Sequence, residues 1–172
     1  MLKRNRIIWP SIILILTLVG CGYSFPGTGS FPEGVNHIFV EVLENKTSES
    51  GIESTVTRNL INEFTLREEE SLSGNINDAD SILSGAVSRI AFHTITSKGK
   101  DSARERRVTV WLSLKLADRE GNVLWAAKDL SDNEAYNVVD DKNETERNKR
   151  AAIDVASKRI AERALNRLTD GF

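Results

Sequence analysis

The single cysteine of the sequence stands where a bacterial lipid-attachment site would place it. Cys21 closes the run Leu18-Val19-Gly20-Cys21, in which an aliphatic residue, a β-branched residue and a glycine precede the cysteine. This is the pattern of a lipobox, and its chemistry requires these residue types. The thiol must be alkylated by a diacylglycerol donor, and small neighbours let the peptide enter the processing enzymes. The alternative is an ordinary signal peptide whose cleavage site happens to adjoin a buried cysteine.

The residues before Cys21 have the composition of a signal peptide. They begin with three basic side chains, which are Lys3, Arg4 and Arg6. The apolar run Ile7–Val19 follows, interrupted by a few residues, and it is shorter than the ~20 apolar residues that an ordinary transmembrane helix needs. We therefore expect residues 1–20 to be removed and Cys21 to become the acylated first residue. Two or more acyl chains hold a protein stably on a membrane.

The residue after Cys21 indicates the membrane in which the protein is anchored, and the net charge argues against one class of partner. Gly22, in place of an aspartate, favours the outer membrane, with the protein on its periplasmic face. The whole chain has a net charge of −2, and removing the three bases of the signal peptide leaves −5. A mildly acidic protein lacks the general basic surface that nucleic-acid binding usually needs, so no nucleic-acid partner is predicted.

No arrangement of side chains in the sequence predicts an active site, a metal site or a cofactor. The two histidines, His37 and His93, stand outside any metal-ligand spacing, and no second cysteine is present to assist them. Nucleophile elbows, phosphate loops and dinucleotide fingerprints do not occur. Acidic pairs such as Asp140-Asp141 fall in expected loops or helix ends, where solvated charge is the common outcome. The sequence therefore predicts that the protein is not an enzyme.

One short stretch carries a local excess of positive charge. Residues 98–107 contain five bases and two acids, Asp101 and Glu105, which gives +3 in ten residues. The bases are Lys98, Lys100, Arg104, Arg106 and Arg107. Side chains of this kind, held on a hairpin, suit phosphate or carboxylate ligands, because arginine binds such groups with two parallel hydrogen bonds. The equally weighted alternative is a solvated edge whose charges prevent aggregation between strands.

The first half of the expected fold has one strand, one helix and a second strand. Residues 37–43 alternate and are rich in β-branched side chains, which predicts a strand. Ser50 and Glu53 have the form of a capping box, and an apolar stripe with a four-residue repeat predicts a helix over about 51–67. Residues 81–96 have the composition of a strand whose inward set changes face, which a bulge would explain.

The second half adds a hairpin and a long helix. Residues 104–117 alternate sharply, the turn 118–122 places Gly121 where a positive φ would be needed, and residues 123–130 form the partner strand. Residues 131–142 read as a polar loop, and a helix is expected from an N-cap at Asn143 to about Leu168. The order β-α-β-β-β-α predicts an α+β fold, with two helices on one face of a four-stranded sheet. Beyond the signal peptide, residues 21–35 are expected to be anchor and linker, and residues 36–172 the folded domain.

Several short motifs, in this order and spacing, resemble those of the lipopolysaccharide-assembly lipoprotein family LptE. The resemblance covers nearly all the mature chain. It rests on Cys21-Gly22-Tyr23-Ser24-Phe25, Glu44-Asn45-Lys46-Thr47, Gly51-Ile52-Glu53, Asp78-Ala79-Asp80, Leu83-Ser84-Gly85-Ala86-Val87, Asp118-Arg119-Glu120-Gly121-Asn122-Val123-Leu124-Trp125 and Ala151-Ala152.

The resemblance implies a two-helix, four-stranded sandwich anchored in the outer membrane, with no catalytic role. It also implies that the protein plugs the lumen of an LptD-like β-barrel translocon and contacts lipopolysaccharide during delivery to the outer leaflet. Only Cys21 is carried over as a family position, and the basic residues from Lys98 to Arg107 are inferred from charge alone. The alternative function is another outer-membrane-anchored periplasmic scaffold lipoprotein that binds protein in envelope assembly.

Overall fold

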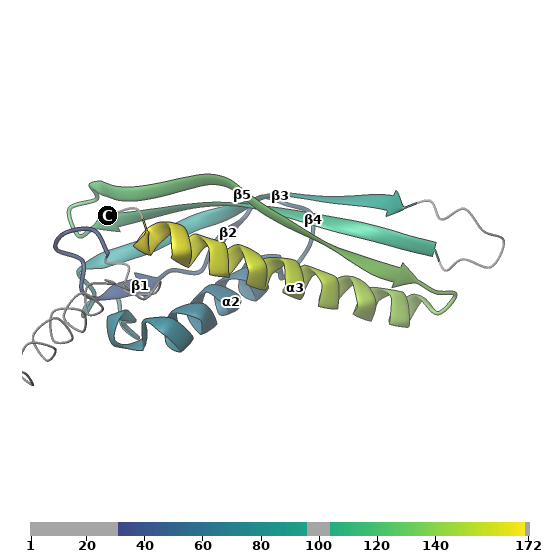
Figure 1. Cartoon of the computed structure of the whole chain (residues 1–172), viewed down its shortest axis with the longest axis horizontal. Helices are drawn as coiled ribbons and strands as arrows, with labels where there is room; N and C mark the ends of the chain where they lie inside the picture. Colours follow the sequence, from purple (N-terminus) through teal and green to yellow (C-terminus); the bar gives the residue numbers. More distant parts are fainter. Residues whose placement is uncertain (1–30, 96–103, 171–172) are drawn as a thin grey trace, which may run out of the picture.

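A long mixed sheet with two helices on one face makes up the molecule, as the computed structural model shows (Figure 1). The structure describes residues 31–95 and 104–170. The strands are β1 (Ile38–Val40), β2 (Glu44–Asn45), β3 (Ser81–Ile95), β4 (Arg104–Asp118) and β5 (Val123–Val138). The helices are α2 (Ile52–Arg67), a short 3-10 turn η1 (Glu69–Ser71) and α3 (Lys142–Thr169). The predicted fold class and element order are confirmed.

Three long antiparallel strands form the body of the sheet, in the order β3-β4-β5. The short strands β1 and β2 both pair in parallel with the first half of β3. They replace the single first strand predicted over residues 37–43. The chain leaves the ladder between them because the Leu43 side chain is buried, and its N–H donates to the hydroxyl of Thr57 in α2.

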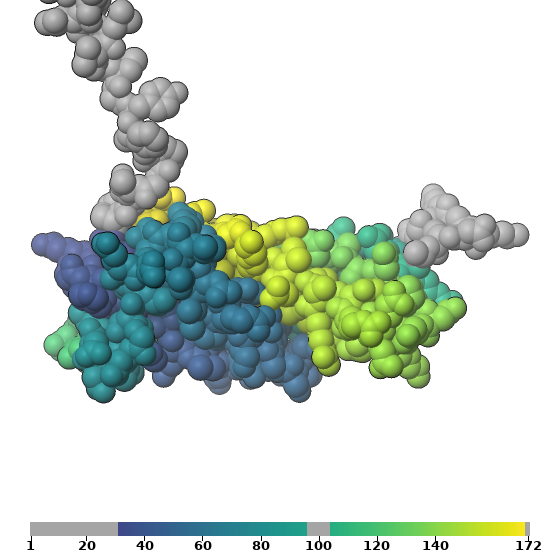
Figure 2. All heavy atoms as spheres, turned by 90° about the horizontal axis from the view of Figure 1, so that it is seen from below, coloured from purple at the N-terminus to yellow at the C-terminus, as the bar shows by residue number. Residues whose placement is uncertain are grey.

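The core lies between the sheet and the two helices, which run side by side over the same face (Figure 2). The alternation predicted for β4 is confirmed, since its even-numbered side chains from Val108 to Leu116 are buried. The stripe predicted for the last helix is also buried. Its residues are Ile153, Ala156, Ile160, Ala164 and Leu168.

A bulge in β3 resolves the ambiguous face of that strand. Val87 pairs with Leu112 and Arg89 pairs with Trp111, so Ser88 is an extra residue with no partner of its own. Before the bulge Leu83 and Val87 point into the core, and after it Ile90 and Phe92 pack against the core. The predicted bulge is therefore confirmed, and it changes which residues of the second half of β3 share a face with those of β4.

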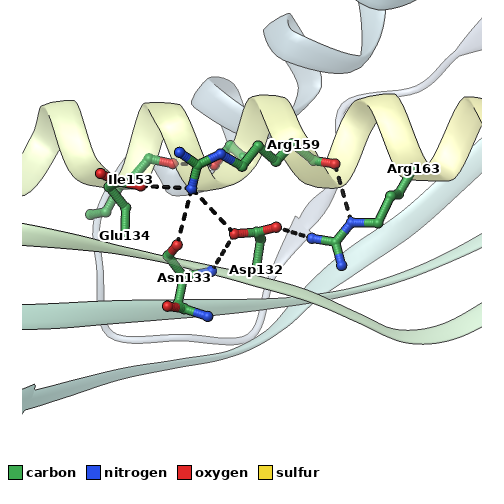
Figure 3. Close-up of polar contacts among 7 residues, drawn as sticks. Asp132, Asn133, Glu134, Ile153, Arg159 and Arg163 are labelled. Atoms are coloured by element: carbon green, nitrogen blue, oxygen red, sulfur yellow. Dashed lines mark hydrogen bonds and ion pairs between the residues drawn. The ribbon is translucent and has the colours of Figure 1, made fainter.

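The predicted polar loop over residues 131–142 is wrong, because β5 continues through Val138. Residues 131–138 pair with β4 from Trp111 back to Arg104. The acidic side chains that suggested a loop are held by arginines of α3. Arg159 donates to Glu134 at 2.6 Å and lies 3.6 Å from Asp132, and Arg163 also pairs with Asp132 (Figure 3).

Both predicted helix caps are also wrong. α2 begins after Gly51, whose φ of 81° is left-handed, and no side chain caps it. The carboxylate of Glu53 instead accepts a hydrogen bond from the Asn45 amide at 2.8 Å. α3 is capped by Asp141, whose side chain accepts from the N–H groups of Asn143 and Glu144, so the helix starts before the predicted cap.

Candidate functional site

The described part of the basic cluster lies at one end of the sheet, where β4 begins. Arg104, Arg106 and Arg107 are all exposed. The other two predicted contacts, Lys98 and Lys100, lie outside the described residues, as does the predicted lipid-attachment site Cys21. The three arginines stand on a central strand that has β3 on one side and β5 on the other. Their backbone is therefore fixed by two ladders of hydrogen bonds.

Alternation along β4 divides the arginines between the two faces of the sheet. Arg104 and Arg106 are on the face that carries Val108, which is the face covered by the helices. Arg106 is directly opposite Thr94 of β3 and Tyr136 of β5. Tyr136 is buried, so the two cations on this face stand beside the apolar core.

Two acids of β5 on the inner face are already engaged. Asp132 and Glu134 of β5 are opposite Val110 and Val108 of β4. They pair with Arg159 and Arg163 of α3 (Figure 3). The hydrogen bond to Glu134, together with its charge, raises the pKa of Arg159. These carboxylates of β5 therefore pair with arginines of α3, and among the described residues none forms an ion pair with the arginines of β4.

The outer face of the same end is also basic, and the sequence analysis missed one of its residues. Arg107 is opposite His93, and Arg89 lies over the ring of Trp111 at 3.9 Å from the ring centroid. This is a close cation–π contact. Arg89 belongs to this group because of the bulge at Ser88, which puts it on the face of Trp111 and Arg107. The face change in the apolar pattern of residues 81–96 was the signal that could have indicated it.

The arrangement is suited to binding an anion. Within residues 31–95 and 104–170, Arg89, Arg104, Arg106 and Arg107 form no ion pair. In that part of the chain no three His, Cys, Asp or Glu side chains gather into a possible metal site. Unpaired guanidinium groups on rigid strands favour phosphate or carboxylate groups.

A recess of the described residues lies elsewhere, between the start of α2 and residues 150–154 of α3. It has a volume of about 770 Å³ and a polar lining that includes Arg58, Arg150 and Asp154. Arg58 is already committed to Asp154, with an N–O distance of 3.1 Å. The recess therefore offers less free charge than the start of β4. No helix of the described residues is long and apolar enough to cross a membrane.

The arrangement of elements is that of solved bacterial lipoproteins. Lipoprotein B from Nitrosomonas europaea is similar with a TM-score of 0.55 at 10% identity, over 87% of this chain and 92% of that one. Rare lipoprotein B from Shewanella oneidensis has a TM-score of 0.51 at 13% identity, over 75% and 94%. A minor lipoprotein from Acinetobacter baumannii has a TM-score of 0.50 at 16% identity, over 80% and 93%. At these identities the likeness establishes the fold.

The sequence itself identifies the family. Residues 35–168 match the model of the LptE lipopolysaccharide-assembly family, so the chain belongs to that family. This confirms the resemblance found in the sequence. No curated protein matches the chain in sequence.

Proposed function

We propose that the protein is an outer-membrane lipoprotein, anchored through Cys21, that works in lipopolysaccharide transport with a β-barrel translocon. In this role it plugs and stabilises an LptD-like barrel and binds lipopolysaccharide for delivery to the outer leaflet. Membership of the LptE family supports the general role in lipopolysaccharide assembly. The observation that carries the binding proposal is the set of exposed arginines at the start of β4, which have no ion pair among the described residues.

The chemistry of the ligand matches this end of the sheet. Lipid A and the inner core of lipopolysaccharide carry phosphates and carboxylates beside acyl chains. Arg104 and Arg106 provide the charges, and the partly buried ring of Phe92 provides apolar surface on the same face. A charge-assisted hydrogen bond contributes about 1.5–3 kcal/mol when it is sheltered and much less when it is fully solvated. Several such contacts are therefore needed.

The binding proposal is tested by removing the charges together. Changing Lys98, Lys100, Arg104 and Arg106 to Gln should weaken binding of purified lipopolysaccharide at least tenfold, about 1.4 kcal/mol, with helical content and melting temperature unchanged. The matched control changes four exposed bases elsewhere to Gln, namely Lys115, Lys128, Lys158 and Arg167. Equal binding by the parent and the first variant at low salt would contradict the proposal. Equal loss in both variants would also contradict it, because the effect would then follow net charge.

The transport role is tested separately, in cells. Depletion of the protein should remove lipopolysaccharide from the cell surface, and the full chain should co-purify from membranes with an outer-membrane β-barrel. A soluble envelope protein recovered in place of the barrel would support the alternative function, a periplasmic scaffold. Surface lipopolysaccharide that is unaffected by depletion would contradict the transport role.

A further inference from the structure

The two halves of β3 differ in what lies beside them. Residues Ser81–Val87 have β4 on one side and β1 or β2 on the other, and the last of these pairs joins Asn45 to Val87. From Arg89 to Ile95, β4 is the only described strand that pairs with β3. None of the described residues outside β4 makes a backbone hydrogen bond to this second half. It is therefore an edge of the sheet, seven residues long (Figure 1).

The pairing fixes which backbone groups this edge presents. The carbonyl of Val87 accepts from the N–H of Lys46, so it points away from β4. The extra residue at the Ser88 bulge shifts by one the alternation of backbone groups toward and away from β4. After the bulge, the N–H and C=O groups of Arg89, Ala91 and His93 therefore point toward β4. The N–H and C=O groups of Ile90, Phe92 and Thr94 consequently point outward, free to accept another strand.

The opposite edge of the sheet is covered along the second half of β5, from Asn133 onward. Along β5, the carbonyl of Asn133 accepts from Arg159 at 3.3 Å, and that of Asn137 accepts from Asn148 at 3.1 Å. Just beyond the strand, the N–H and C=O of Val139 both bond to the Thr145 hydroxyl at 3.0 Å. Side chains of α3 thus occupy the carbonyls that a further strand would use, as natural proteins do to protect an edge. The edge of β3 has no such cover among the described residues.

The side chains of this edge define what could pair with it. Ile90 and Phe92 on the inner face are partly buried and pack against the core. On the outer face Arg89 and His93 are exposed, with Arg107 beside them on β4. A second copy of the chain would bring basic residues against basic residues across the new pair, which is unfavourable. The matching strand is apolar on its inner face and acidic on its outer face.

We propose that residues Arg89–Ile95 accept an extended segment of a protein partner as an additional antiparallel or parallel strand. Main-chain hydrogen bonds supply the affinity in this mode of binding, and the alternating side chains supply the specificity. The segment carries acidic side chains toward Arg89 and Arg107, and apolar ones toward Ile90 and Phe92. The proposal rests on the proposed function in one respect, since it takes the segment to belong to the β-barrel partner.

Amide hydrogen exchange on the full lipidated chain tests this proposal directly. In the free protein the N–H groups of Ile90, Phe92 and Thr94 should exchange rapidly, while those of Ala91 and His93, bonded to β4, should be protected. In the complex purified with the barrel, the first three should slow at least tenfold. Unchanged exchange at these three amides in an intact complex would overturn the proposal, and it would leave the transport role standing.

A pair of variants at one exposed position separates the backbone from the side chain. Thr94→Pro removes an outward N–H, which an edge strand tolerates, and Thr94→Val keeps it. The proline variant should dissociate from the barrel at least fivefold faster than the valine variant, with both melting as the parent does. Equal dissociation would overturn the proposal. Failure of the parent itself to retain the barrel would contradict the proposed function instead.

Discussion

Arg159 of α3 and Glu134 of β5 are joined by a hydrogen bond of 2.6 Å, although they are 25 residues apart in sequence. With Asp132 and Arg163 they fasten the second half of β5 to the last helix (Figure 3). Tyr136 and Val138 of this segment pack on the core, and the ion pairs add a second attachment through its acidic side chains.

Neutralising Glu134 should therefore loosen the end of β5. Glu134→Gln keeps the shape and a neutral acceptor but removes the charge that Arg159 faces. We expect faster amide exchange over residues 133–138 and a lower melting temperature, while exchange in β3 stays unchanged. Glu120→Gln, in the exposed turn between β4 and β5, is the control. Identical exchange in the two variants would show that backbone pairing alone holds this segment.

Gly85 is required by the closeness of β4 rather than by its own backbone angles. A methyl group at this position would overlap the carbonyl oxygen of Ser113 and press on the Leu114 side chain. Gly85→Ala should therefore lower the free energy of unfolding by at least about 2 kcal/mol, as overpacking does. Urea denaturation measures the change. The control is Gly74→Ala, where no atom lies within 4 Å of the added methyl. Equal stability of both variants would contradict the overlap.

Asp80 ties the start of β1 to the start of β3. Its carboxylate accepts from the N–H groups of Asn36 at 2.9 Å and His37 at 3.0 Å. Partial burial alone would raise the pKa of Asp80, but these hydrogen bonds outweigh it and hold the pKa below its ordinary value of 3.8. The ionised group is thus favoured in the folded state, and its contribution to stability is fully present above pH 3.8.

That contribution should disappear in acid. As the pH falls below 3.8 and through the lower pKa of the folded state, the carboxylate is protonated and the stabilisation is lost. Asp80→Asn should cost about 1 kcal/mol at pH 7. The difference between the parent and the variant should shrink between pH 4 and pH 2, as measured by urea midpoints. A difference that stays constant over this range would mean that the charge of Asp80 contributes nothing.

The proposed lipid attachment depends on one thiol, because the sequence contains one cysteine. Cys21→Ser should abolish incorporation of a labelled fatty acid and leave the precursor uncleaved at this site. Membrane fractionation with the label is the measurement, and Ser24→Ala, three residues later, is the control. Label on the serine variant would show that the lipobox assignment is wrong. Partial transport by the serine variant is expected, since the proposed plug would also be held by its contacts with the barrel.

The parts of the fold that the sequence predicts are those governed by local pattern. β4 was predictable because every second residue from Val108 to Leu116 is apolar, and this matches a strand with one covered face. The long helices were predictable from their stripes. The bulge in β3 could be inferred because an apolar pattern that changes face cannot belong to a regular strand.

The remainder depends on contacts between distant residues. The acidic side chains of Ser131–Val138 made this stretch look like a polar loop. It is a strand because Arg159 and Arg163 of α3 pair with those acids, and no local pattern reveals these partners. The cap at Ser50 failed because Gly51 adopts a left-handed angle and Glu53 is used by Asn45. In the candidate site, the faces of Arg104, Arg106 and Arg107 follow from alternation. That Arg89 also belongs to the candidate site can be seen only once the register between β3 and β4 is known.

The length of β4 separates the two ends of the sheet by a fixed distance. Phe31, where the described chain begins, stacks on Phe64 near the end of α2, at the end of the sheet where Ser81 pairs with Asp118. Arg104 stands at the other end of the same ladder, 15 residues of strand away, which is about 50 Å. That span exceeds the ~30 Å hydrocarbon core of a bilayer. Deleting one two-residue repeat from each long strand would move the cations about 7 Å closer to the Phe31–Phe64 pair, so the length of the strands sets how far apart the two ends of the sheet lie.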